Sequence, residues 1–129
     1  MTRIRLNEGS SRQVTFTLVD NAGVVVPLTD IAQATLTLFD LETYDPIGSP
    51  LRGIINTRDD QNVKNANDVT IHATSGLVTW EMQGDDNPIN IRRRQIERHR
   101  AEFRFVTTSG AILDADAIEF EVVNMGKRV

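Results

Sequence analysis

The sequence predicts an all-β protein, an antiparallel β-sandwich of about seven strands with one long Asn/Asp-rich loop. Apolar and polar residues alternate with period two in short runs along the whole chain. Gly, Asn and Asp turns separate these runs, and no long segment with helical periodicity competes with them. The 129 residues fit one domain, expected to span 1–129, and are enough to bury a core.

The first half of the chain contains two clear strand patterns, at 12–20 and 34–40. The turn residues NAG follow the first pattern, and Pro27 marks an edge or a break before the second. Threonines occupy the positions between the apolar ones. We expect the following side chains to share the inward face: Val14, Phe16, Leu18, Leu36 and Leu38.

The second half contains four more patterns, at 68–73, 77–82, 100–106 and 117–123. We expect these side chains to point inward: Val69, Ile71, Ala73, Val78, Trp80, Met82, Ala101, Phe103, Phe105, Ile118, Phe120 and Val122. If the last two runs pair, Arg100 or Arg104 lies across from Glu119 or Glu121, and each such pair contributes about 0.2–1 kcal/mol. A short helical turn is expected within 85–99, where Pro88 suits a first turn.

Composition excludes several kinds of chemistry. The chain has no Cys and two His, so disulfides, thiol chemistry and classical zinc sites are not expected. The N-terminus lacks the apolar region of a secretory signal, and the apolar runs are too short to span a bilayer. We therefore expect no cofactor, no metal and no membrane partner.

The segment INTRDDQNVKNAND (55–68) is unusually rich in Asn and Asp. These residues stabilise irregular loops through bonds to their own backbone, and long loops are also where docking surfaces occur. The oxygens suit Ca²⁺, but the EF-hand Gly and closing Glu are missing, so calcium is the weaker alternative. We expect a docking loop whose amides bond a neighbouring subunit, with these interface residues: Asn56, Arg58, Asp59, Asp60, Asn62 and Asn65.

Charge is distributed unevenly along the chain. The net charge is −4, yet residues 92–104 carry +4 and the remainder −8. Arginine binds carboxylates and phosphates through two hydrogen bonds and is enriched at interfaces, whereas a solvated, charged strand edge is the simpler interpretation. We expect this cluster to contact other copies or an acidic partner, through Arg92, Arg93, Arg94, Arg98, Arg100 and Arg104.

Two acid-containing motifs invite a catalytic interpretation. The adjacent carboxylates of GDDNP (84–88) fit a capped turn before Pro88 better than an acid–base pair. Glu97 and His99 share one face if they lie on a strand, but no nucleophile elbow accompanies them. We therefore expect His99 to be a surface residue between arginines and the protein not to be an enzyme.

The segment VTFTLVDNAGVVVPLTDIAQATLTLFD resembles the opening of immunoglobulin-like domains in tailed-phage structural proteins, such as the baseplate upper-protein N-terminal domain. The resemblance rests on a strand ending in Asp20, a turn with Gly23, and the pair Leu28–Thr29 before the next strand. The later segments SGLVTWEM and the strand ending in Val123–Asn124 are also similar. The resemblance implies an immunoglobulin-like sandwich and a non-enzymatic structural subunit of a virion, assembled in the host cytoplasm.

Three functions follow, in order of preference. The first is a virion structural protein, a capsid decoration subunit rather than a tail, neck or baseplate attachment protein, because the chain has no residues left for a second module. It would contact capsid or tail subunits in many copies. The second is a carbohydrate- or cell-surface-binding module, with Tyr44 as its one obvious loop aromatic. An enzyme ranks last, and nucleic acid is not an expected partner.

Overall fold

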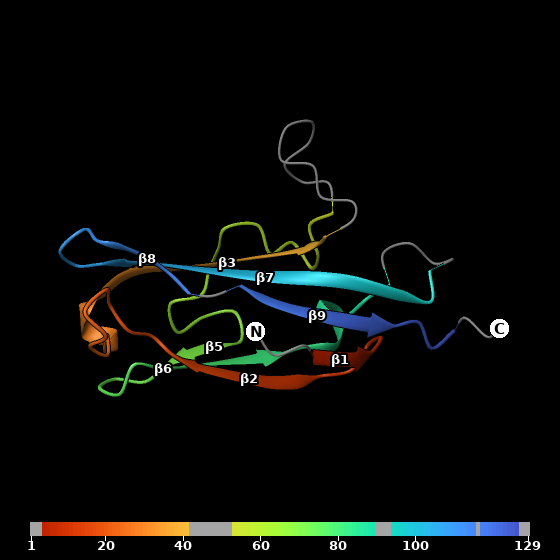
Figure 1. Ribbon diagram of the computed structural model, residues 1–129, viewed down its shortest axis with the longest axis horizontal. Coiled ribbons are helices and arrows are strands. Elements are labelled where there is room, and N and C mark those ends of the chain that lie inside the picture. Colours follow the sequence, from red (N-terminus) through yellow and green to blue (C-terminus); the bar gives the residue numbers. More distant parts are fainter. Residues whose placement is uncertain (1–3, 42–52, 90–93, 116, 127–129) are drawn as a thin grey trace.

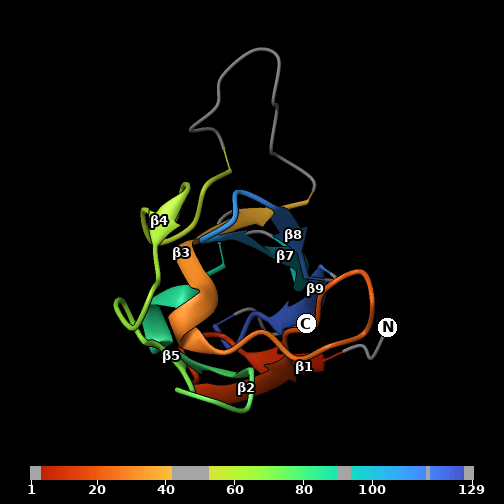
Figure 2. The ribbon, with the colours of Figure 1, turned by 90° about the vertical axis from the view of Figure 1, so that its left-hand side faces the viewer.

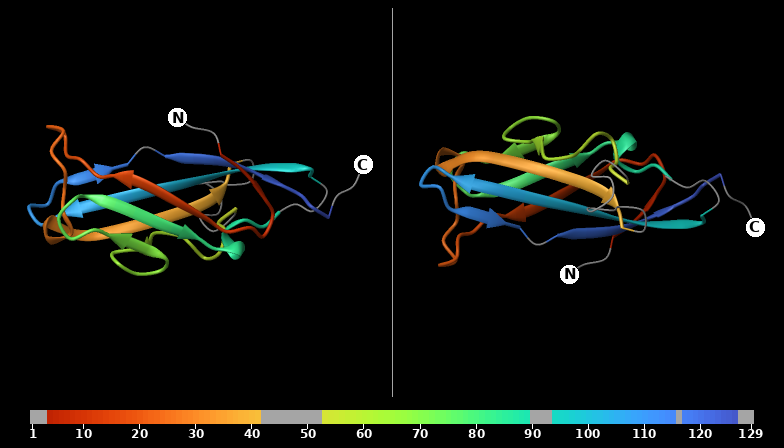
Figure 3. Two further views of the ribbon diagram at one scale, coloured as in Figure 1. Left: turned by 90° about the horizontal axis from the view of Figure 1, so that it is seen from below. Right: turned by 90° about the horizontal axis from the view of Figure 1, so that it is seen from above.

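The computed structural model describes residues 4–41, 53–89, 94–115 and 117–126, and it confirms the predicted β-sandwich. Two sheets form the two layers, and their strands follow the long axis of the molecule (Figure 1, Figure 3). Among these residues, helical structure is limited to two 3-10 turns, η1 (Leu28–Asp30) and η2 (Gly84–Asp86). None of the described helices is long and apolar enough to cross a membrane.

The larger sheet is built around one long strand, β7 (Ile96–Thr107), with strand order β1-β9-β7-β3-β4. β8 also pairs with β7, beyond the end of β9, so these two strands share one edge of β7. The other strands of this sheet are β1 (Ile4–Asn7), β3 (Ile31–Asp40), β4 (Gln61–Asn62), β8 (Ile112–Asp114) and β9 (Ile118–Val123).

The smaller sheet contains β2 (Arg12–Thr17), β6 (Leu77–Met82) and β5 (Val69–Ile71), in the order β2-β6-β5. All its pairings are antiparallel. Viewed along the strands, the two sheets enclose the core between them (Figure 2). Ile4 and Ile118 on the inner face of the larger sheet are only half-buried, so the smaller sheet does not cover this face completely.

Aromatic side chains occupy the centre of the core. Trp80 of β6 is fully buried and meets Phe103 and Phe120 of the opposite sheet edge-to-face, with ring centroids 5.7 and 6.5 Å apart. Phe103 and Phe105 stack on the same face of β7. Edge-to-face contacts stabilise beyond the area they bury. The period-two pattern thus placed these residues on the correct face.

The strand faces were predicted well and the strand ends less well. The inward positions of β2, β3, β6, β7 and β9 are buried or half-buried as expected, and Arg100 lies directly across from Glu119. Ala73, however, is exposed, because β5 ends at Ile71 and His72 Nδ1 accepts the backbone N–H groups of Thr74 and Ser75 in a turn.

Three further features differ from the expectation. The short strands β1, β4 and β8 were not predicted, so the described residues contain nine strands rather than about seven. β1 runs parallel to β9, although the other described pairs are antiparallel. Within the range 85–99 expected to hold a helical turn, Asp85 and Asp86 belong to η2, which ends before Pro88, and the chain is in strand β7 from Ile96 onward. Residues 90–93 of this range lie outside the described part of the chain.

Candidate functional site

The Asn/Asp-rich loop closes one side of the sandwich. Its backbone runs along the outer edge of β3, where Leu38 donates to the Arg58 carbonyl at 2.8 Å and accepts from the Ile55 N–H at 2.9 Å. Further along, Val63 N–H donates to the Ala34 carbonyl, and β4 pairs with β3. The edge of the larger sheet is therefore covered by the protein's own loop.

The same loop caps the β5 edge of the smaller sheet. The Val69 N–H donates to the Ala66 carbonyl, and the Ile71 N–H donates to the Asn65 side chain at 2.6 Å. Asn67 donates from its amide to the Asn62 carbonyl, and the Asn62 side chain accepts the Lys64 N–H. The amides of this loop thus bond their own chain and join the exposed edges of both sheets.

Left-handed backbone explains the choice of residues in this loop. Among the residues that the structure describes, six other than Gly have positive φ, and all belong to the loop: Asn56, Thr57, Asp60, Asn65, Asn67 and Asp68. Asn and Asp adopt this conformation at lower cost than other residues because their short polar side chains bond locally. The unusual composition is therefore required by the loop's backbone.

Replacing Asn65 with Ala should lower the free energy of unfolding by about 1–3 kcal/mol, because the Ile71 N–H loses its acceptor and Ala is strained at a φ of 49°. Asn65→Gly should cost less, since Gly adopts positive φ freely and only the hydrogen bond is lost. Urea unfolding followed by tryptophan fluorescence measures both. Equal losses for the two variants would contradict a contribution from backbone strain.

Arg58 is the hub of this loop. Its side chain is 2 % exposed and binds Asp86 through two bonds, Nε to Oδ1 at 2.5 Å and a terminal N–H to Oδ2 at 3.1 Å. The guanidinium also donates to Asp68, to the Gln61 side chain and to the Asn67 carbonyl. A buried charge of this kind is tolerated only when it is paired and hydrogen-bonded in this way.

The electrostatics of Arg58 favour its charged form. Burial acts to lower the pKa of the guanidinium, but the hydrogen bonds and negative charges of Asp86 and Asp68 outweigh burial and raise it above the ordinary value. The guanidinium also lies 5.9 Å from the centre of the Trp80 ring. Arg58 is thus a permanently charged link between the loop, η2 and the core.

The predicted docking role of Arg58 needs correction, because its side chain is inside the protein. Asn62 uses its side-chain amide within the loop, Asn65 accepts the Ile71 N–H of β5, and Asn56 donates to the Asp86 carboxylate at 2.8 Å. Asp59 and Asp60 are exposed and remain candidates for contact with another molecule. Within the described ranges, no group of three or more acidic or His side chains is arranged to hold a metal ion.

The GDDNP motif forms the expected capped turn, η2. Asp86 accepts the Gln83 N–H at 2.8 Å, and the two residues complete a capping box. The Asp86 carboxylate is fully buried, whereas the adjacent Asp85 is exposed. The two carboxylates therefore point into different environments and do not form an acid–base pair.

A second buried polar cluster lies at the end of the larger sheet where β3 ends and β7 begins. Glu97 and His99 are fully buried, and His99 Nε2 lies 2.9 Å from a Glu97 carboxylate oxygen. Arg94 donates to buried Asp40 at 2.9 Å and lies 3.5 Å from Glu97. These four side chains form the Asp40–Arg94–Glu97–His99 cluster.

The expectation of a surface His is wrong. His99 belongs to the same face of β7 as Ala101, Phe103 and Phe105, and it packs edge-to-face against Phe120. If the period-two alternation of the apolar residues of β7 is extended towards the N-terminus, it places both Glu97 and His99 on the inward face. This signal was overlooked because charged residues are seldom fully buried. The pair is therefore part of the protein interior.

Two of the outward arginines of β7, Arg100 and Arg104, are paired with acids on β7 and on the neighbouring strands. Arg100 bonds Glu102 at 3.0 Å and Glu119 at 3.2 Å, and Arg104 bonds Asp114 at 3.0 Å, which raises the pKa of Arg104. Arg98 is exposed and lies across from Glu121. This face is therefore a mixture of neutralised charges rather than a continuous positive patch. Arg92 and Arg93, and also Tyr44, lie outside the described residues.

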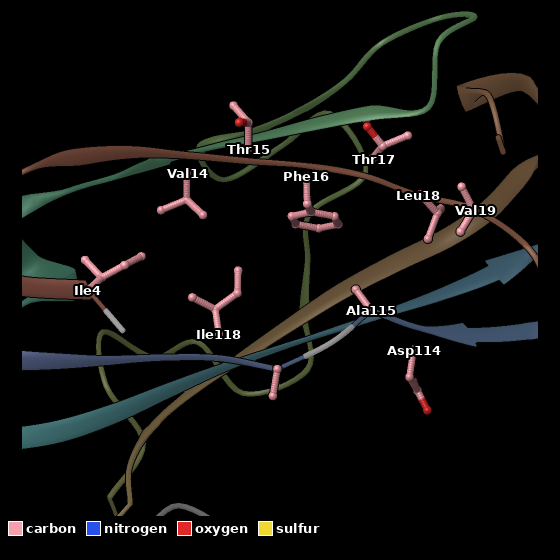
Figure 4. A pocket seen from close by; sticks show the side chains of 11 residues that line it. Ile4, Val14, Thr15, Phe16, Thr17, Leu18, Val19, Asp114, Ala115 and Ile118 are labelled. Carbon is pink, nitrogen blue, oxygen red and sulfur yellow. The ribbon is translucent and has the colours of Figure 1, made fainter. Parts of the chain in front are cut away.

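An open side of the sandwich lies opposite the loop. There an apolar groove of about 450 Å³ separates the edge strand β2 from the segment that connects β8 and β9. Val14, Phe16 and Leu18 point into it from β2, and Ile118 faces them from β9 (Figure 4). This groove was not predicted, because it depends on how far the smaller sheet covers the larger one.

Comparison with protein families and with curated proteins finds no match to this chain. The fold and the geometry above are therefore the basis for any functional proposal.

Proposed function

We propose that this protein is a non-enzymatic structural subunit of a bacteriophage virion that decorates the capsid. The observation that carries the proposal is the burial of the polar side chains that have catalytic potential. Glu97, His99 and Asp86 have no exposed surface and serve the fold. The exposed features are an ion-paired sheet face and an open sheet edge beside an apolar groove, and both suit contacts between proteins.

The turn that carries the phage resemblance supports the proposal in physical terms. Asp20 accepts the N–H groups of Ala22 and Val24 through one carboxylate oxygen, and Gly23 has a φ of 81°. Asp20 and Gly23 of this motif thus each have a specific conformational task in the turn.

A binding site for sugars receives less support from the side chains. Carbohydrate sites use exposed aromatic platforms, whereas the described aromatic residues are buried, apart from Phe16, which is half-buried in the groove. We therefore keep the structural role as the proposal.

Immunogold labelling of gradient-purified virions from the source tests this proposal. We expect label over the head. Label confined to the neck or tail would replace decoration with attachment while keeping the virion assignment. Particles free of both label and the protein, as measured by mass spectrometry of the same fractions, would overturn the proposal.

A further inference from the structure

The edge of β2 is the unprotected edge of the smaller sheet. Leu18 N–H donates to Gly76 on the β6 side, so in this antiparallel pair the even-numbered residues of β2 face β6. The backbone groups of Gln13, Thr15 and Thr17 consequently face away from β6, and no described strand pairs with them. Lys, Pro and bulges, the usual protection of an edge strand, do not occur in β2.

On the opposite side of the molecule, by contrast, the sheet edges are protected. The Asn/Asp-rich loop covers the outer edges of β3 and β5, as described above. On the open side, the groove lies directly under the β2 edge, and the inner face of the larger sheet is left partly uncovered. Ile4 and Ile118 are half-buried there, and Val19 is 43 % exposed. One more strand beside β2 would cover this surface.

The charges at the two ends of this edge indicate which strand fits. Arg12 is exposed and has no ion-pair partner among the described residues, and Asp20 lies at the opposite end. An incoming antiparallel strand needs an acid opposite Arg12 and a base opposite Asp20. The segment from Arg12 to Asp20, which comprises β2 and the three residues after it with apolar side chains at the alternate positions between, satisfies both requirements when it is turned by 180° about Phe16.

We propose that two copies of this chain associate through β2, pairing antiparallel about a two-fold axis at Phe16 to form one continuous sheet across the dimer. Thr15 of each copy then pairs with Thr17 of the other, and Arg12 lies opposite Asp20 of the other copy. Phe16, Val14 and Leu18 of both copies form one apolar row over the two grooves. Such an interface is isologous and closed.

This contact supplies a repeated interaction of the kind that a virion subunit needs, but it does not depend on the proposed function. It is tested on the purified chain, whereas the virion assignment is tested on particles. The failure of one test therefore leaves the other intact.

Charge reversal at the outward threonines gives the sharpest test. The paired variants are T15K/T17K and T15E/T17E, which place like charges opposite each other in the homodimer and opposite charges in the mixture. Sedimentation velocity from about 1 µM to 1 mM covers the range in which a contact of this size dissociates. We expect a concentration-dependent dimer for the natural chain, association weakened about tenfold or more for each variant alone, and recovery of the dimer on mixing the two variants.

Thr79→Lys is the matched control, because Thr79 sits on the same face of the same sheet, opposite Thr15 but one strand in from the edge. It should dimerise like the natural chain, and circular dichroism should show all variants folded. A natural chain that stays monomeric at every concentration, as would fit a groove for another protein, overturns the proposal. Unchanged dimerisation of the Lys variant overturns it too.

Discussion

Replacing Arg58 with Met should lower the free energy of unfolding by about 3–5 kcal/mol, the loss expected when one partner of a buried ion pair is removed. Met preserves much of the side-chain volume, so the loss is electrostatic rather than a cavity. The Asp86 carboxylate would stay fully buried with only the Asn56 amide and the Gln83 N–H as donors. Chemical denaturation monitored by fluorescence of Trp80, which lies beside the guanidinium, reports the loss directly.

A double-mutant cycle separates the ion pair from the loop's other contacts. Asp86→Asn removes the matching charge while keeping most of the shape, so Arg58→Met combined with Asp86→Asn should be destabilised clearly less than the sum of the two single variants. Arg58→Lys is an informative intermediate, because Lys keeps the charge but not the two parallel bonds to Asp86. Additive losses would mean that Arg58 stabilises the protein independently of Asp86, through its other hydrogen bonds and its packing.

The partners of Arg58 could not be predicted from the sequence, whereas the inward residues of the main strands could. Period two identified the inward residues of the main strands because each faces a core that requires apolar side chains. The partners of Arg58 lie ten and twenty-eight positions further along, at Asp68 and Asp86, and no local pattern joins them. Their proximity depends on the path of the loop across two sheet edges.

The composition of the loop was interpreted correctly in one respect. Asn and Asp stabilise irregular backbone, and the positive φ values and local amide bonds are the physical form of that preference. What the sequence did not provide was the direction of the remaining bonds, inward to β3 and β5 rather than outward to a partner. Docking through Asp59 and Asp60 stays a prediction.

The arginines require a similar distinction between positions. Arg94 and Arg98 are equivalent in composition, but one reaches a pair of buried carboxylates and the other is exposed on the outer face of the sheet. The residue spacing alone does not tell them apart, because Arg94 precedes the first residue of β7 and follows no strand alternation.

Arg94→Ser should consequently destabilise the protein by about 3 kcal/mol, the lower end of the loss for a broken buried pair, because the Arg94 side chain is itself 19 % exposed. Asp40 and Glu97 would each lose a cationic partner while remaining fully buried. A triple replacement of Arg92, Arg93 and Arg94 therefore cannot leave the isolated fold unaffected. Assembly is better tested with Arg92 and Arg93 alone.

Arg98→Ser is the matched control for Arg94, since it removes an exposed Arg from the same segment and should change stability by no more than about 0.5 kcal/mol. Adding Glu97→Gln to Arg94→Ser should recover part of the loss, because one of the two buried negative charges is gone while an acceptor for His99 is kept. Thermal unfolding of all three variants under one buffer condition makes the comparison. An Arg94 loss no larger than that of Arg98 would show that the buried carboxylates do not depend on this cation.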